Sequence, residues 1–182
     1  MIDDGQSPDS LGANAIDAEG YPQSKTRVVE NGVLKGFLFD TYFGRSFGLE
    51  STGNCSRGSS VFGNSTPYES GPTASTKRLR VSPGKQSFDD LISNTEEPTI
   101  LIKEFPIGIF HGNVATGEFS AVANEAFLVE KGEIKYPLDP VSVAGQFYEG
   151  LSNMREIGSD IMNSMFGVDL PTLVFDGFTI VG

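Results

Sequence analysis

The chain has little of the side-chain chemistry on which hydrolases most often depend: its 182 residues include one histidine, His111, and one cysteine, Cys55. A single cysteine excludes an internal disulfide, which is typical of a reducing compartment, so we expect a cytoplasmic protein. A hydrolytic zinc needs three protein ligands and an open position for water, and one histidine excludes the helical motifs that contain two. We therefore predict no catalytic residue, no metal and no other cofactor in this chain.

A hydrolase built on His111 and Cys55 is the alternative. A cysteine thiolate oriented by an imidazole is a nucleophile pair, and the same two side chains with a carboxylate would offer zinc ligands. Neither arrangement has a local sequence signature here. Cys55 lies in a loop of serine and glycine, and His111 is equally explained as a polar cap at the end of a strand.

Basic residues and long apolar runs are also scarce. Thirteen lysines and arginines against 24 aspartates and glutamates give a net charge of −11. An acidic surface repels phosphate backbones and attracts cationic peptides, so we expect no direct nucleic-acid partner. Lys77, Arg78 and Arg80 form the one basic cluster, which we interpret as a solvated strand edge. No apolar run approaches the ~20 residues that span a bilayer, so no membrane partner is expected.

Turn signals divide the chain into short strands. Asn31-Gly32 predicts a hairpin over residues 25–39, because both residues of such a turn need positive φ, and Lys131-Gly132 predicts a similar hairpin over 125–136. Residues 1–24 are rich in turn formers and predict an extended arm. Residues 51–76 are mostly small and polar and predict a long loop. Further strands are expected at 77–82, 99–105, 117–126, 173–175 and 178–181.

Three helices are predicted. Asp40 caps one over 40–48, with Tyr42, Phe43 and Phe47 facing inward, and Ser87 caps another over 88–95. The longest helix is expected over 143–160, where apolar residues recur at helical spacing. Together the elements predict a single α+β domain over 1–182, strand-dominated, with mostly antiparallel sheets in a sandwich or barrel-like arrangement.

Glycine-rich segments are the candidate contact regions. They are STGN at 51–54 and the stretch from Gly108 through Gly112 to Gly117. Glycine allows close approach of another backbone, and a sheet edge beside such loops is able to accept an extended peptide as an added strand. Plain turn geometry explains the same glycines.

The order of short motifs along nearly the whole chain resembles the C-terminal half of the TldD/PmbA family, also called the modulator-of-DNA-gyrase family. The motifs are IDDG at 2–5, DAEG at 17–20, ENGVLKGFLFD at 30–40, STGN at 51–54, TGEFS at 116–120, VEKGEIKYP at 129–137 and VAGQFYEGLSNMREIGSD at 143–160. Each motif alone is weak, but their order and spacing are specific.

The resemblance implies a two-part protomer in a metallopeptidase complex. In the TldD branch an α/β region upstream carries an H-E-x-x-x-H zinc motif, and a cysteine near the C-terminus completes the metal site. The corresponding tail here, FGVDLPTLVFDGFTIVG at 166–182, has no cysteine. This chain is therefore similar to the PmbA (TldE) branch, whose members lack the metal.

A non-catalytic subunit that helps to form a chamber and holds unfolded peptide is thus the expected function. The implied partner is a TldD-like catalytic subunit that carries the zinc, or a second copy of the chain. Candidate peptide or interface contacts are Gly53, Asn54, His111, Gly112, Thr116 and Phe119. A binding module with no protease partner is the further alternative.

Overall fold

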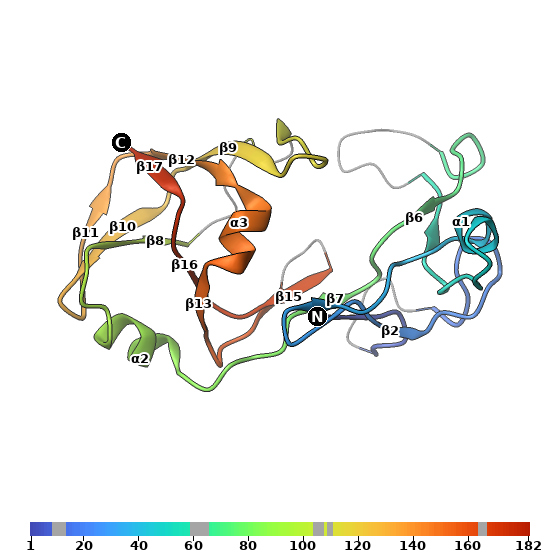
Figure 1. Cartoon of the computed structure of the whole chain (residues 1–182), viewed down its shortest axis with the longest axis horizontal. Helices are drawn as coiled ribbons and strands as arrows, with labels where there is room; N and C mark the ends of the chain where they lie inside the picture. The colour runs from blue at the N-terminus through green and yellow to red at the C-terminus, as the bar shows by residue number, and fades with distance from the viewer. Residues whose placement is uncertain (9–13, 59–65, 104–107, 109–110, 164–166) are drawn as a thin grey trace. The chain divides into compact units, whose positions relative to one another are not determined.

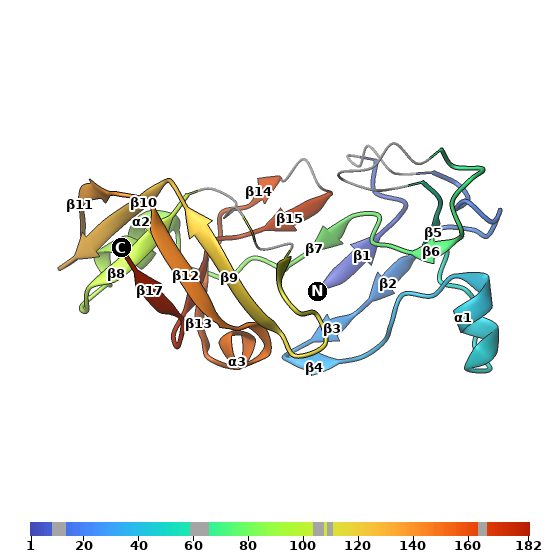
Figure 2. The same cartoon turned by 90° about the horizontal axis from the view of Figure 1, so that it is seen from above.

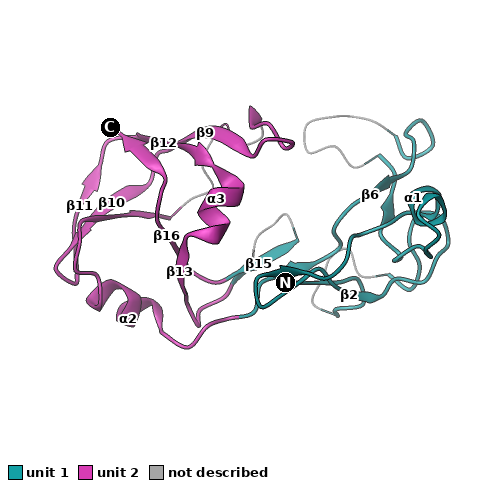
Figure 3. Cartoon of the chain, in the orientation of Figure 1, with its two compact units in different colours: residues 1–82, 162–170 teal, residues 83–161, 171–182 magenta. Residues whose placement is uncertain are grey.

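The computed structural model describes residues 1–8, 14–58, 66–103, 108, 111–163 and 167–182. These residues form two compact units (Figure 3). Unit 1 comprises Met1–Ser82 and Met162–Leu170, and unit 2 comprises Pro83–Ile161 and Pro171–Gly182. The predicted fold class is confirmed: the described residues form three helices and many short, mostly antiparallel strands, and none of their sheets closes into a barrel.

Unit 1 contains a five-stranded sheet in the order β14-β15-β7-β1-β2 (Figure 2). Its strands are β1 (Ile2–Asp4), β2 (Lys25–Arg27), β7 (Leu79–Arg80), β14 (Met162–Asn163) and β15 (Val168–Leu170). The β15–β7 pair is parallel, and the other pairs are antiparallel. The arm expected over residues 1–24 therefore begins with a strand, because β1 pairs on one side with β2 and on the other with β7.

The interpretation of the basic cluster as a solvated edge was wrong. β7 lies between β15 and β1, and Arg78 is only 8% exposed. Its guanidinium donates two hydrogen bonds to buried Asp169, with Nε 2.8 Å from Oδ2 and Nη2 3.0 Å from Oδ1. Arg80 Nε lies 2.7 Å from the same Oδ2. Burying an ion pair costs desolvation free energy, and hydrogen bonds to both partners offset that cost.

The first predicted hairpin and helix are present in shortened form. Strands β3 (Val29–Glu30) and β4 (Val33–Leu34) pair across Asn31 and Gly32, whose φ values are 50° and 75°. Helix α1 (Thr41–Ser46) begins at Asp40, whose carboxylate accepts the N–H of Phe43, as expected for an N-cap.

The predicted inward face of α1 was wrong. Tyr42, Phe43 and Phe47 are 68%, 49% and 68% exposed, whereas Gly44 is the buried residue of the helix. A Cβ on Gly44 would lie 2.9 Å from the carbonyl carbon of Glu50, so the chain approaches α1 at the position that lacks a side chain. Backbone packing against a glycine therefore decided the orientation of this helix.

A two-stranded ladder follows α1. Strands β5 (Cys55–Ser56) and β6 (Thr73–Ala74) pair inside the stretch predicted as a long loop, of which residues 59–65 lie outside the described part.

Unit 2 contains three small antiparallel sheets, with the orders β11-β10-β8, β17-β12-β9 and β13-β16 (Figure 1). Their strands are β8 (Thr99–Ile102), β9 (Glu118–Ala123), β10 (Ala126–Glu130), β11 (Glu133–Leu138), β12 (Val141–Gln146), β13 (Met154–Ile157), β16 (Leu173–Phe175) and β17 (Thr179–Val181). Helix α2 (Phe88–Ser93) has the predicted Ser87 cap. The second predicted hairpin is confirmed as β10 and β11, with Lys131 and Gly132 at positive φ.

The apolar core of the described residues lies in unit 2. Ala123, Ala126, Val141 and Val143 form a buried cluster, and Phe119 and Phe178 are among the residues that pack on it. The strand expected over 117–126 is present as β9, on which Ala121 and Ala123 are buried and Phe119 is half-buried.

The long helix predicted over 143–160 was wrong. The segment is divided into the end of β12, the six-residue helix α3 (Phe147–Ser152) and β13. β12 pairs with β9 on one side and β17 on the other, so ladder hydrogen bonds outweigh a helical apolar pattern. None of the helices in the described part is long and apolar enough to cross a membrane.

Candidate functional site

The six predicted contact residues fall into two groups. Gly53 and Asn54 belong to unit 1, and His111, Gly112, Thr116 and Phe119 belong to unit 2. The structure brings Gly53 and Asn54 together with buried Asp3, and it places Thr116 in the turn before β9 and Phe119 within β9.

Gly53 holds a tight turn in unit 1. Its φ is +74°, and a Cβ built on it would collide with the carbonyl oxygen of Pro22. Both the backbone conformation and the close approach of the 22–23 segment therefore require glycine at this position.

Asn54 links the N-terminal strand to this turn. The side chain is only 1% exposed, and its Nδ2 donates to Asp3 Oδ2 at 2.6 Å and to the carbonyl oxygen of Ser75 at 3.0 Å. Asp3 is fully buried, and its other oxygen accepts the N–H groups of Lys77 and Arg78, each at 2.9 Å. Asp3 and Asn54 thus join three distant segments of unit 1.

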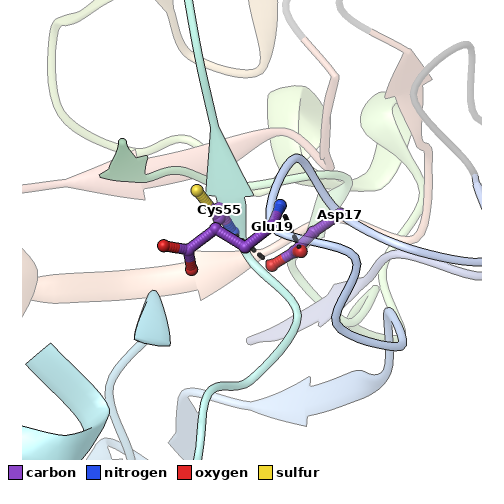
Figure 4. A group of neighbouring side chains, drawn as sticks. All are labelled: Asp17, Glu19 and Cys55. Carbon is purple, nitrogen blue, oxygen red and sulfur yellow. Dashed lines mark hydrogen bonds between the residues drawn. The ribbon is translucent and has the colours of Figure 1, made fainter. Parts of the chain in front are cut away.

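A second group of side chains lies beside Cys55 (Figure 4). One ligand atom from each of Asp17, Glu19 and Cys55 lies within 4.8 Å of the others. Asp17 Oδ1 accepts the N–H groups of Glu19 and Tyr21, and Oδ2 accepts the N–H of Cys55, all at 2.9 Å. Glu19 Oε2 accepts the N–H of Thr41 at 2.8 Å.

Protonation in this group follows from these contacts. Hydrogen bonding to Thr41 lowers the pKa of Glu19 despite partial burial, and the Cys55 thiol contributes a further hydrogen bond. Burial raises the pKa of Cys55, and the negative charges of Glu19, Asp17 and Asp40 raise it further. Cys55 is therefore a protonated thiol at neutral pH rather than a nucleophile or a ready metal ligand.

The group does not fit a zinc ion as it stands. A zinc site uses thiolate, imidazole or carboxylate atoms directed at one point, whereas here the carboxylate oxygens accept backbone N–H groups and the sulfur keeps its proton. The contacts instead explain the group as a set of turn hydrogen bonds that fix the β5 strand to the 17–21 turn.

Sequence reasoning did not single out Asp17 and Glu19. The available signal was the polar turn DAEGYP, because an aspartate at the start of a turn often accepts backbone N–H groups two to four residues later. What the sequence could not indicate was that Cys55, 38 residues further on, donates its own N–H to Asp17.

In unit 2, a loop over residues 113–117 precedes β9. Asn113 Oδ1 accepts the N–H of Ala115 at 3.0 Å, and the Thr116 carbonyl oxygen accepts a hydrogen bond from Gln146 Nε2 at 2.6 Å. Tyr148 donates from its hydroxyl to the carbonyl oxygen of Val114 at 2.6 Å. The loop is thereby tied to helix α3, although Thr116 itself stays exposed.

The loop and helix α3 expose apolar and acidic side chains. Val114 is 87% exposed, and Tyr148 of α3 is 49% exposed. Tyr148, Glu149, Ser152 and Asn153 line an open hollow of about 330 Å³ on α3. Phe119 is half-buried, and its ring packs edge-on to Phe178 with the ring centres 5.3 Å apart. The loop and α3 therefore present a surface with exposed apolar groups and one carboxylate.

His111 is exposed, and its backbone N–H donates to the carbonyl oxygen of Gly108 at 2.9 Å. Gly112, next to it, is half-buried. His111 belongs to unit 2 and Cys55 to unit 1.

The family model described as the PmbA/TldA metallopeptidase C-terminal domain matches residues 1–182. The chain therefore belongs to this family of metallopeptidase domains.

Individual relatives agree with this assignment. A metalloprotease TldD homolog from Buchnera aphidicola (subspecies Acyrthosiphon pisum) is 26% identical over 198 residues, covering 100% of this chain and 38% of the relative. A metalloprotease PmbA homolog from Haemophilus influenzae is 28% identical, covering 83% of this chain and 29% of the relative. The crystal structure of TldE from Thermococcus kodakarensis has a TM-score of 0.81 at 30% identity, covering 100% of this chain and 39% of that chain. This chain thus spans less than two fifths of the length of these relatives.

Proposed function

We propose that this chain acts as the C-terminal domain of a PmbA/TldE-like subunit in a metallopeptidase complex. It helps to form the chamber and holds unfolded peptide, while a TldD-like partner supplies the zinc. The observation that carries the proposal is the tail over residues 166–182. In the TldD branch this region is expected to supply a cysteine to the metal, and here it contains none.

The state of Cys55 supports the same assignment. The chain has one cysteine, and that thiol is fully buried with its pKa raised. A buried, protonated thiol is not an exposed thiolate ligand, so Cys55 does not take the place of a tail cysteine. Bound zinc polarises a scissile carbonyl and activates water, so in this proposal that chemistry belongs to the partner.

Peptide holding is assigned to the loop at 113–117 and helix α3. Val114, Tyr148 and Phe147, which is 48% exposed, offer apolar contact, and Glu149 offers one negative charge. A net charge of −11 attracts cationic segments of an unfolded peptide before contact. Our candidate contacts in unit 2 stay His111, Gly112, Thr116 and Phe119, of which Thr116 and Phe119 lie within or next to this surface.

The experiment is co-expression with a TldD-type subunit that carries H-E-x-x-x-H. We expect the two chains to purify together and to cleave an unfolded peptide, and we expect a chelator to abolish cleavage. Tyr148→Ala with Val114→Ser should weaken peptide binding without separating the subunits. Peptide cleavage by this chain alone that survives a chelator and is lost in His111→Ala would contradict the proposal and favour the alternative hydrolase.

A further inference from the structure

Three polar side chains of unit 1 meet beside the β5–β6 ladder and are used neither in turn formation nor in the proposed peptide surface: Ser56, Ser75 and Lys77. Lys77 Nζ lies 2.6 Å from Ser56 Oγ and 2.7 Å from the carbonyl oxygen of Cys55. Ser56 Oγ lies 2.6 Å from Ser75 Oγ. All three residues are half-buried, so they contact the protein frame and are also open to solvent.

The backbone holds each of these side chains in place. Ser56 pairs with Thr73 in the β5–β6 ladder. The N–H of Ser75 donates to the carbonyl oxygen of Asn54 at 3.0 Å, and the N–H of Lys77 donates to buried Asp3 at 2.9 Å. Backbone hydrogen bonds therefore fix the positions from which the three side chains extend, and a reactive group requires such fixed positions.

This arrangement has the parts of an activated nucleophile. A serine hydroxyl becomes nucleophilic when a base within hydrogen-bond reach takes its proton and a third group orients the pair. A lysine is such a base once it has lost its proton, and burial favours the neutral amine. Burial lowers the pKa of Lys77, although the negative charges of Asp17 and Asp3 act in the opposite direction.

We propose that Ser56, Lys77 and Ser75 form a serine–lysine site for acyl transfer, with carboxylic esters as the substrate class. Ser56 is the nucleophile and Lys77 is the base, while Ser75 is a positioning residue that orients the Ser56 hydroxyl. This site is metal-independent and additional to the peptide-holding role.

The reaction balances with water as the co-substrate. Ser56 Oγ bonds to the ester carbonyl carbon while its proton passes to the neutral Lys77 amine. The bond to the alcohol oxygen breaks, and that oxygen leaves with the proton from Lys77. Water then attacks the acyl-serine, gives its proton to Lys77, and releases the carboxylic acid. Return of that proton restores the Ser56 hydroxyl.

A fluorophosphonate probe tests the proposal directly, because an activated serine displaces fluoride and keeps the phosphonyl group. We expect the folded chain to be labelled once, at Ser56, as mapped by peptide mass spectrometry, and labelling should vanish in denaturant. Labelling should speed up with pH and level off at a pH below the ordinary lysine pKa of about 10.4.

Variants separate reactivity from structure. Ser56→Ala should lose the label, and Lys77→Arg should lose it while keeping the melting temperature, because a guanidinium stays protonated and cannot act as the base. Ser75→Ala should slow labelling at least several-fold and leave its pH profile unchanged. Ser24→Ala is the matched control, since Ser24 is an exposed serine of the same unit whose hydroxyl donates to the carbonyl oxygen of Thr52.

Absence of Ser56 labelling in the folded wild-type chain overturns the proposal, whatever the variants do. Labelling at Ser56 that Lys77→Arg leaves unchanged also overturns it, because the base would then lie elsewhere. Both results are independent of zinc and of a partner subunit, so they leave the proposed function untouched.

Discussion

At the scale of single residues, unit 1 depends on buried polar side chains more than on apolar ones. Among the described residues of this unit, Cys55 is the buried hydrophobic residue, while Asp3, Asp17, Asp40 and Asn54 are buried and polar. Each of these four accepts or donates hydrogen bonds to the backbone of a distant or neighbouring segment. Replacing one of these side chains is expected to destabilise the fold by more than the size of the side chain indicates, because a buried partner then loses its hydrogen bond.

Gly53→Ala tests the tight turn. The new methyl group would meet the backbone of Pro22 and Gln23, and φ is positive, so we expect a loss of about 3 kcal/mol in the free energy of unfolding. Gly71→Ala is the control, because a Cβ there has open space and its φ is ordinary. Urea unfolding followed by circular dichroism measures both, and equal stability of the two variants would contradict this account of the turn.

The Cys55 thiol should not react with alkylating reagents in the folded chain. Its side chain is fully buried and its pKa is raised, so thiolate is scarce. Iodoacetamide at neutral pH should leave Cys55 unmodified until denaturant is added, as intact mass will reveal. Rapid alkylation of the native chain would mean that the thiol is exposed and ionised.

At the scale of secondary-structure elements, the two hairpins and two capped helices were predictable, because their signals are local. Asn31-Gly32, Lys131-Gly132, Asp40 and Ser87 each act within a few residues. The helix expected over 143–160 failed because β12 is held by strands from elsewhere in the chain, and no local pattern carries that information.

At the site too, residues in local motifs were predictable from the sequence, whereas contacts between distant segments were not. Asn54 and Gly53 were selected from the STGN motif, and the structure gives both a clear structural role. The meeting of Asp17 with Cys55, and of Lys77 with Ser56, depends on long-range folding. Spacing along the sequence therefore could not indicate either pair.

Asp40→Ala tests the cap of α1. Loss of the hydrogen bond from the Phe43 N–H should lower stability by about 1 kcal/mol. Ser46→Ala, at the exposed end of the same helix, should have a much smaller effect. Thermal unfolding by circular dichroism compares the two, and an Asp40→Ala protein as stable as the wild type would exclude a capping role.

At the scale of the whole molecule, the ion pairs of Asp169 connect β15 to β7 in the sheet of unit 1. Burial alone would raise the pKa of Asp169, but hydrogen bonds and positive charge from Arg78 and Arg80 hold it below the ordinary value. A lowered folded-state pKa means that the unfolded chain binds the proton more readily. The stabilisation is therefore complete above the unfolded pKa of about 3.9 and is lost as the pH falls through the folded value.

Asp169→Asn should therefore lower stability by about 3 kcal/mol at neutral pH, since it leaves buried Arg78 without its counter-charge. Its stability should also change less than that of the wild type between neutral and acidic pH. Asp176→Asn is the control: Asp176 faces Arg155 in an ion pair whose side chains are both 60% exposed. Such pairs contribute little. If the stability of Asp169→Asn and that of Asp176→Asn changed by the same amount between neutral and acidic pH, the stabilising role of the Asp169 ion pairs would be refuted.

The zinc content of the purified chain is the most direct test of the central claim. After co-expression with a TldD-type partner, the two subunits should be separated and each should be measured by inductively coupled plasma mass spectrometry. We predict stoichiometric zinc in the partner and only background zinc in this chain, unchanged by Cys55→Ser. Zinc bound in equal proportion to this chain and lost in Asp17→Asn or Cys55→Ser would contradict the account.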